Sequence, residues 1–183
     1  MLAGSKPVGG KSGGSPPGAV GSRIVMLFTG IYELTIDPKN RLSIPATVRA
    51  AMDPERDGTR FYLVPGDRRG TLSLYGDSYF ERYAEQYHSS LRPGEEKENF
   101  EMVFYSMATL LDIDRQGRVV LPQRTMDFVG IQRQVTLTGA RNHLVLWNRS
   151  DFAAFMKEHW DRYPEMLRRS QPGTAVPFSQ ERA

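Results

Sequence analysis

Hydrophobic and polar residues follow the same succession in each half of the chain. Each half has two short alternating segments, a short helical segment, two more alternating segments and a longer segment with apolar residues at helical spacing. Strands are predicted at residues 31–36, 41–44, 61–64, 71–75, 109–113, 118–121, 135–138 and 143–146. Helices are predicted at 45–52, from a capping box at 78–81 onward, at 95–107, at 122–129 and from Ser150 to Pro164. The pattern predicts an α+β fold of two ββαββα units with flanking helices.

The two halves also repeat each other in sequence. Leu34–Pro45 returns 77 positions later as Leu111–Pro122 without a gap. Identical residues stand at Leu34/Leu111, Ile36/Ile113, Asp37/Asp114, Arg41/Arg118 and Pro45/Pro122. Leu72–Tyr75 likewise aligns with Leu144–Trp147. Identities at fixed spacing indicate that the whole unit is duplicated.

The repeated segment predicts a β-hairpin with a sharp tip. Asp-Pro-Lys-Asn in the first copy and Asp-Arg-Gln-Gly in the second are turn formers between alternating apolar strands. Asn40 and Gly117 share one turn position, and Asn and Gly tolerate a positive φ best, so we expect left-handed backbone there. The arginine that follows, Arg41 or Arg118, is then expected on a rigid tip.

The chain divides into four predicted parts. Residues 1–25 are rich in Gly, Ser and Pro and are predicted to be a disordered extension. Residues 26–92 form the first repeat, residues 93–163 a linking helix and the second repeat, and residues 164–183 a tail predicted to be disordered. One repeat alone would expose strand edges and half a core, so we expect the two to interlock in one barrel. Phe152, Phe155, Met156 and Trp160 are predicted to face inward from the last helix.

Composition narrows the chemistry. The 183 residues contain no cysteine, which excludes disulfides and thiolate metal sites, and the three histidines have no ligand-like spacing. The net charge is only +3, and much of it lies in the N-terminal extension, so a polyanion would have to meet local basic clusters. The longest apolar runs are too short to span a membrane. We expect a cytoplasmic protein without a cofactor, a metal, a membrane partner or a small-molecule substrate.

With both motifs in view, the chain resembles the MraZ family of bacterial transcriptional regulators. The resemblance covers about residues 26–162 and rests on Phe28–Glu33, the two Asp-x-x-x-Arg turns and the late Leu-Trp-Asn segment. It implies tandem AbrB-like swapped-hairpin barrel units, a ring of several subunits, and binding to repeated DNA sites in the promoter of the division and cell wall gene cluster. Two positions depart from the family pattern: Asn40 replaces a usual glycine and Thr29 replaces a common arginine.

The residues expected to contact DNA are the cations of the two turns, namely Lys39, Arg41, Arg115 and Arg118. The residues expected to orient the turns are Asp37, Asn40, Asp114 and Gly117. The resemblance places the family signature on Asp37, Arg41, Asp114 and Arg118, and its first-turn basic residue on Lys39. The partners implied are double-stranded DNA with direct repeats and further copies of the chain, with a nucleoid location.

Other interpretations stay open. Each arginine can simply pair with its own aspartate and tie the turn, which contributes about 0 to 1 kcal/mol for an exposed pair. An AbrB-type antitoxin or another partner-binding module would use the same fold. An enzyme is disfavoured, because the sequence shows no catalytic constellation and the nucleotide-binding motifs are missing from it.

Overall fold

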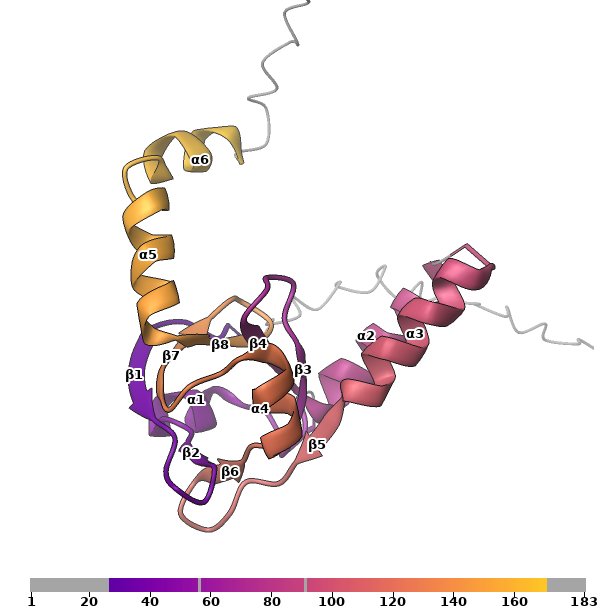
Figure 1. Cartoon of the computed structure of the whole chain (residues 1–183), viewed down its shortest axis with the longest axis horizontal. Coiled ribbons are helices and arrows are strands. Elements are labelled where there is room, and N and C mark those ends of the chain that lie inside the picture. The colour runs from indigo at the N-terminus through magenta and orange to yellow at the C-terminus, as the bar shows by residue number, and fades with distance from the viewer. Residues whose placement is uncertain (1–26, 56, 91, 171–183) are drawn as a thin grey trace, which may run out of the picture.

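The computed structural model describes residues 27–55, 57–90 and 92–170 (Figure 1). The expected extension at residues 1–25 and the tail beyond residue 170 lie outside these residues. The strands are β1 (Ile31–Thr35), β2 (Arg41–Ser43), β3 (Phe61–Pro65), β4 (Thr71–Gly76), β5 (Thr109–Leu111), β6 (Arg118–Val120), β7 (Gln134–Gly139) and β8 (Leu144–Asn148). The helices are α1 (Ala46–Ala51), α2 (Asp77–Ser90), α3 (Glu95–Met107), α4 (Gln123–Val129), α5 (Arg149–His159) and α6 (Tyr163–Arg169). The predicted ββαββα order occurs twice, with α3 as the link.

The two halves exchange their first strands. A six-stranded antiparallel sheet has the order β1-β7-β8-β4-β3-β5, and a second sheet contains only β2 and β6. β1 of the first half pairs with β7 of the second, and β5 of the second half pairs with β3 of the first. Replacing each strand by its repeat counterpart gives the same order read backwards. The fold therefore has an approximate twofold axis that passes between β4 and β8 and between β2 and β6.

This exchange corrects the predicted hairpins. The strands on either side of each turn belong to different sheets, so β1 does not pair along β2, and β5 does not pair along β6. The mouth of each turn is bonded, with the Asp37 N–H donating to the Arg41 carbonyl at 3.0 Å and the Asp114 N–H donating to the Arg118 carbonyl at 2.8 Å. The hydrogen-bonded ladders of the described residues also remain two sheets and do not close into the expected barrel. The chain leaves each turn toward the other half, because β2 and β6 pair with each other.

One hydrophobic core joins both halves. Its fully buried side chains come from the six-stranded sheet, from the β2–β6 pair and from the short helices, and include Leu42, Leu63, Leu74, Val119, Leu121, Leu137, Leu144 and Leu146. Full burial of one such side chain contributes about 1.5–3 kcal/mol. Since Leu42 and Val119 face each other from different halves, the core belongs to neither half alone.

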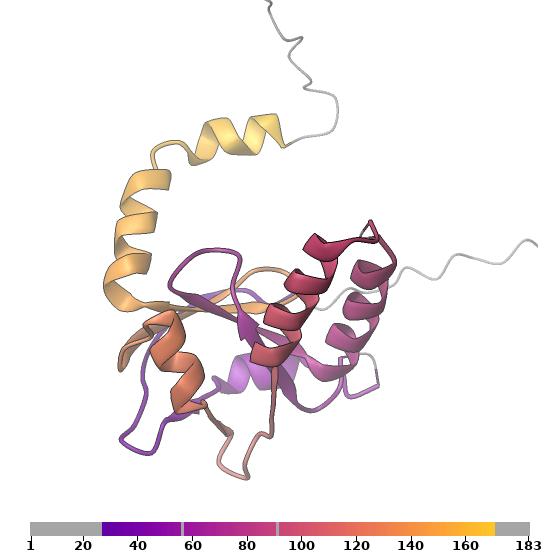
Figure 2. The ribbon, with the colours of Figure 1, turned by 45° about the vertical axis from the view of Figure 1, so that its right-hand side comes forward.

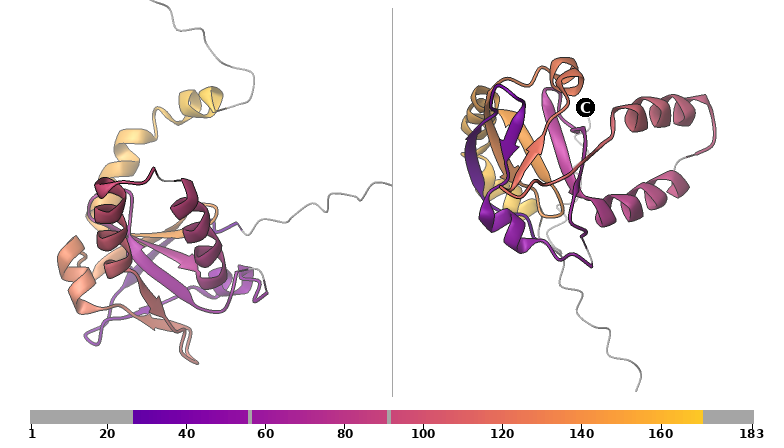
Figure 3. Two further views of the ribbon diagram at one scale, coloured as in Figure 1. Left: turned by 90° about the vertical axis from the view of Figure 1, so that its right-hand side faces the viewer. Right: turned by 90° about the horizontal axis from the view of Figure 1, so that it is seen from below.

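Helices α2 and α3 project together from one side of the sheets (Figure 3). They cover a second apolar cluster formed by Val64, Tyr75 and Phe80, against which Phe104 packs. The predicted stripe of α3 is buried only in part, because Val103 on the same helix remains 60% exposed. One face of the helix pair is therefore left open.

The C-terminal helices differ from the prediction. Helix α5 ends at His159, and Pro164 lies at the start of α6, where a missing N–H costs nothing. Trp160, predicted to face inward, is 62% exposed and stacks on Tyr163. The chain from residue 164 to 169 is helical, and the predicted disordered tail is wrong for that stretch. Helices α5 and α6 extend away from the sheets (Figures 1 and 2).

The predicted serine caps are also wrong. Helix α2 begins at Asp77 directly after β4, and α5 begins at Arg149 directly after β8, so Ser78 and Ser150 lie inside their helices. The side chain of Asp77 bonds Arg60, and that of Asn148 bonds the backbone near β7. These buried polar residues tie each helix start to the segment that precedes the neighbouring strand.

Candidate nucleic-acid interface

The two predicted turns lie side by side at the end of the molecule opposite α5 and α6 (Figures 1 and 2). We call residues 37–41 the first tip and residues 114–118 the second tip. The β2–β6 ladder joins them, since Arg41 faces Val120 and Ser43 faces Arg118 in its register. The fold thus brings together two turns that are far apart in the sequence.

Asp37 organises the first tip through both oxygens of its carboxylate. Its Oδ1 accepts hydrogen bonds from the backbone N–H of Lys39 at 2.8 Å and of Arg41 at 2.9 Å. Its Oδ2 accepts from Nε and Nη2 of Arg41, both at 2.6 Å. The backbone closes the turn, because the N–H of Asn40 donates to the Asp37 carbonyl at 2.9 Å. One carboxylate therefore fixes the turn and holds the arginine.

The second tip repeats this network. Oδ1 of Asp114 accepts from the N–H of Gln116 at 2.8 Å and of Arg118 at 3.0 Å. Its Oδ2 accepts from Nε and Nη2 of Arg118 at 2.9 Å and 2.8 Å. The N–H of Gly117 donates to the Asp114 carbonyl at 2.8 Å. The Asp-x-x-x-Arg motif is thus a local structural unit in which the first and last side chains form a hydrogen-bonded ion pair.

The backbone at the shared turn position is left-handed, as the sequence predicted. The φ angle is 59° at Asn40 and 77° at Gly117. Asparagine is one of the few residues with a side chain that adopt this region readily. The departure from glycine at Asn40 therefore preserves the turn.

Both motif aspartates are held in the charged state. Hydrogen bonds from the backbone and side chain of Arg41 lower the pKa of Asp37, and those from Arg118 do the same for Asp114. Donors that favour the carboxylate over the carboxylic acid lower a pKa in this way. Each tip therefore carries a permanent ion pair at neutral pH.

Backbone hydrogen bonds also connect each tip to the other half across the approximate twofold axis. The N–H of Leu121, which follows β6, donates to the carbonyl of Asn40 at 2.8 Å. The N–H of Ile44, which follows β2, donates to the carbonyl of Gly117 at 2.9 Å. At the first tip, Nδ2 of Asn40 adds a bond to Oε1 of Gln123 at 2.9 Å. The left-handed residue of each tip is thus fixed by the other half.

Two arginines outside the motif, which the sequence pattern did not predict as site residues, contact the tips. Nη1 of Arg133 donates to the Asp37 carbonyl at 2.6 Å. The guanidinium of Arg49 lies against Gly117, where an added Cβ would be 2.6 Å from its Nε. At the offset of 77, Arg49 aligns with Met126. An arginine in one copy opposite an apolar residue in the other was the signal available in the sequence.

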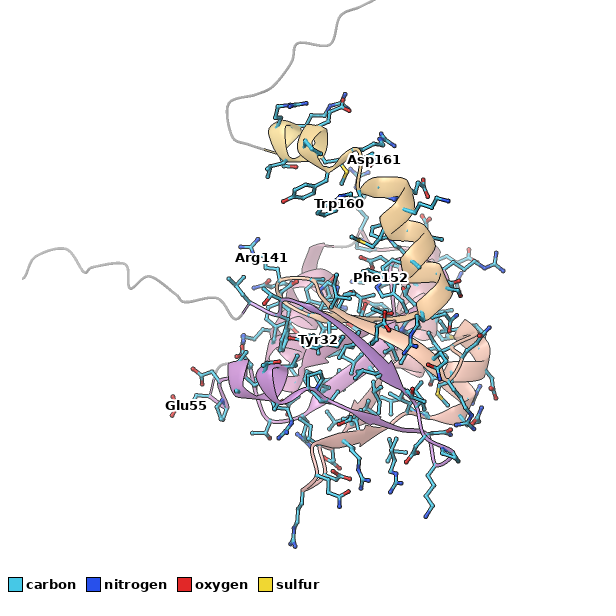
Figure 4. All side chains as sticks on the ribbon, turned by 90° about the vertical axis from the view of Figure 1, so that its left-hand side faces the viewer. Tyr32, Glu55, Arg141, Phe152, Trp160 and Asp161 are labelled. Atoms are coloured by element: carbon cyan, nitrogen blue, oxygen red, sulfur yellow. The ribbon has the colours of Figure 1, made fainter. Side chains whose placement is uncertain are left out.

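The remaining predicted tip cations, Lys39 and Arg115, are exposed. Nitrogen-tipped side chains project from this end of the molecule, away from the labelled Trp160 and Asp161 (Figure 4). Within the described residues, a cluster of three or more side chains able to hold a metal is absent. The same part of the chain contains no helix that is both long and apolar enough to cross a membrane.

Comparisons with known proteins agree on one family. A family model described as "MraZ protein, putative antitoxin-like" matches residues 104–165. The transcriptional regulator MraZ of Mycoplasmopsis pulmonis is 30% identical over 131 residues, which span 71% of this chain and 84% of that protein. The regulators of the same name from Mycoplasmoides gallisepticum and Moorella thermoacetica are 24% and 29% identical, over 94% and 92% of their lengths and 76% and 75% of this chain. The chain belongs to the MraZ family.

Proposed function

We propose that this protein is a sequence-specific, DNA-binding regulator of transcription that contacts DNA with its two tips. The observation that carries the proposal is the pair of matching arginine-bearing turns at one end of the molecule. The names of its relatives as transcriptional regulators support it. With DNA as its partner, the protein would work at the nucleoid in the cytoplasm.

Pairing with aspartate does not disqualify the motif arginines as DNA contacts. Arginine has five N–H donors, and Asp37 occupies one edge of the Arg41 guanidinium, formed by Nε and Nη2. The outer edge, formed by Nη1 and the second N–H of Nη2, keeps two parallel donors. Such an edge matches O6 and N7 of guanine, and a good bidentate pair contributes about 1–3 kcal/mol of discrimination. The aspartate then reduces the entropy lost when the arginine binds.

Lys39 and Arg115 are proposed to contact the phosphates that flank the bases. Both stand exposed in the turns, two or three positions from the motif arginine. Phosphate contacts fix the position of a protein on the duplex but carry no sequence information. In each tip, one arginine would therefore contact a base and one further cation would contact the DNA phosphates.

Affinity is proposed to come from a ring that presents many tips to repeated sites, each chain being an AbrB-like pair of swapped-hairpin units. A nearly neutral chain with two small tips binds a single site weakly. Linked tips can raise the avidity by about 10²–10⁴ without new contacts, where bending lets DNA reach them. The open edges of β1 and β5 and the exposed apolar side chains of α3 and α6 are the surfaces proposed for subunit contacts.

Fluorescence anisotropy on DNA from upstream of the encoding gene tests this function. We expect Arg41→Ala and Arg118→Ala to weaken binding by at least about tenfold each, as the loss of a bidentate base contact predicts. The loss should be larger for Arg41, which has Lys39 beside it across a constrained asparagine. Arg162→Ala, at the opposite end of the molecule, is the control and should bind like the parent. The proposal is wrong if both tip variants keep the parent's affinity and salt dependence.

A second candidate is a partner-binding module of the antitoxin type. The description of the matching family model as antitoxin-like favours it, as does the exposed apolar side of α6, with Met166 and Leu167 44% and 47% exposed. This candidate predicts that the parent protein binds the upstream DNA no better than a shuffled duplex, even at low salt. The same anisotropy series therefore separates the two functions.

A further inference from the structure

Arg133 braces the first tip from the other half of the chain. Its Nη1 donates to the Asp37 carbonyl at 2.6 Å, and its own carbonyl accepts the N–H of Ile36 at 2.9 Å, which continues the β1–β7 ladder. The arginine also borders a cleft of about 170 Å³ between the first tip and α4. Its side chain is therefore fixed at one nitrogen while the residue stays exposed.

Arg49 lies against the second tip, again from the other half, although it comes from α1 and is not the repeat counterpart of Arg133. Its Nε donates to the Ile44 carbonyl at 3.2 Å, and the N–H of Ile44 donates to the Gly117 carbonyl. The guanidinium lies so close to Gly117 that a side chain there would displace it. Arg49 is exposed, and within the described residues no carboxylate forms an ion pair with Arg49 or Arg133.

These two arginines change the charge of the tips. Each tip has one aspartate and two basic residues, and the aspartate neutralises the motif arginine with which it pairs. One net positive charge then remains at each tip, on Lys39 or on Arg115. Arg133 and Arg49 double that charge.

We propose that Arg133 and Arg49 are a second set of DNA-backbone contacts, each supplied to the tip of the other half. The proposal rests on DNA binding by the tips and extends it to residues outside the motif. Both guanidinium groups are held by a single nitrogen against a backbone carbonyl, and the other nitrogens make no protein hydrogen bond within the described residues. A preorganised guanidinium with free donors is well suited to a phosphate.

The salt dependence of binding to a mixed-sequence duplex tests this inference, because each phosphate contact lowers log K by about 0.9 per unit of log salt. We expect Arg49→Gln and Arg133→Gln each to reduce the magnitude of the slope of log K against log salt by about one for every tip that contacts the DNA. The charge-retaining variants Arg49→Lys and Arg133→Lys should keep the parent's slope. A purely structural role would change the melting temperature of the variants but not this slope.

Arg162→Gln is the matched control, since it removes the same charge from an exposed residue far from the tips. The inference is overturned if the glutamine variants keep the parent's slope, or if the control loses as much. Failure of the parent itself to bind DNA contradicts the proposed function instead. Loss of binding in Arg41→Ala with unchanged slopes for Arg49→Gln and Arg133→Gln contradicts only the inference.

A measurement on the unmodified sequence covers the case in which a glutamine variant does not fold. Phenylglyoxal modifies accessible arginines, and mass spectrometry reports the extent at each position. We expect the mixed-sequence duplex to protect Arg49 and Arg133 and to leave Arg162 reactive. Equal modification of Arg49 and Arg133 with and without the duplex would refute their contact with DNA.

Discussion

Asn40 and Gly117 hold the same turn position, but their surroundings leave different amounts of room for a side chain. Asn40 has room for its side chain, which bonds Gln123, whereas the Arg49 guanidinium covers the corresponding side of Gly117. The first tip therefore accepts either residue, whereas a side chain at the second would have to displace the end of Arg49. The neighbour from the other half sets this difference, because the two backbones have similar φ angles.

Gly117→Ala is expected to lower the free energy of unfolding by about 1–3 kcal/mol, because it places a Cβ at a positive φ and against Arg49. Asn40→Gly should cost less than about 1 kcal/mol, chiefly through the entropy of the unfolded chain. Urea unfolding of the two variants beside the parent measures both values. A cost for Gly117→Ala as small as that for Asn40→Gly would contradict this expectation.

The motif aspartates predict how stability depends on pH. The folded state lowers the pKa of Asp37 and Asp114, so their contribution is present above the ordinary value of 3.8 and is lost as the pH falls through the lowered folded values. Urea midpoints between about pH 2 and pH 7 should therefore fall more steeply at the acid end for the parent than for an Asp37→Asn, Asp114→Asn double variant. Parallel curves would show that the pairs do not contribute.

At the scale of elements, the strand exchange makes each half depend on the other. Within the described residues β1 pairs with no strand other than β7, and β3 is flanked on one side by β5. A single half therefore leaves four ladders unmade, namely β1–β7, β2–β6, β3–β5 and β4–β8, and exposes half of the shared core. Duplication in one chain supplies the missing strands without a second subunit.

A fragment of residues 27–92 is expected not to fold as a monomer. It keeps β1 to β4 and α2 but lacks β7, β6 and β8, which pair with β1, β2 and β4. Circular dichroism during heating, combined with light scattering to fix the mass, should show no cooperative unfolding while the fragment is monomeric. A monomer with a sharp transition would contradict the shared core.

Whether a feature could be predicted depends on how far apart in the sequence its interacting residues are. Most strand and helix positions, the left-handed turns and the Asp-x-x-x-Arg tips depend on residues within about four positions of each other, and the sequence pattern predicted them. The exchange of strand partners and the contact of Arg133 with Asp37, 96 positions away, depend on the whole topology. Trp160 and Val103 fit an apolar periodicity but lie where the described chain leaves more than half of each side chain exposed.

At the scale of the whole molecule, the two tips share one rigid base. The bonds from Leu121 to Asn40 and from Ile44 to Gly117 cross the approximate twofold axis, and the β2–β6 ladder lies between the tips. A change in one turn is therefore transmitted to the strand that carries the other. The relative position of the two tips is therefore set by backbone hydrogen bonds within the fold.

The approximate nature of the twofold axis has a consequence for any DNA that the tips bind. A true twofold protein matches a palindrome, because its two contact surfaces are identical. Here one tip has Lys39, Asn40 and a bracing Arg133, while the other has Arg115, Gly117 and a bracing Arg49. The two ends of the molecule along the duplex thus differ, and the two halves of its binding site would differ in sequence. Sites of that kind recur in the same orientation when identical subunits are arranged head to tail.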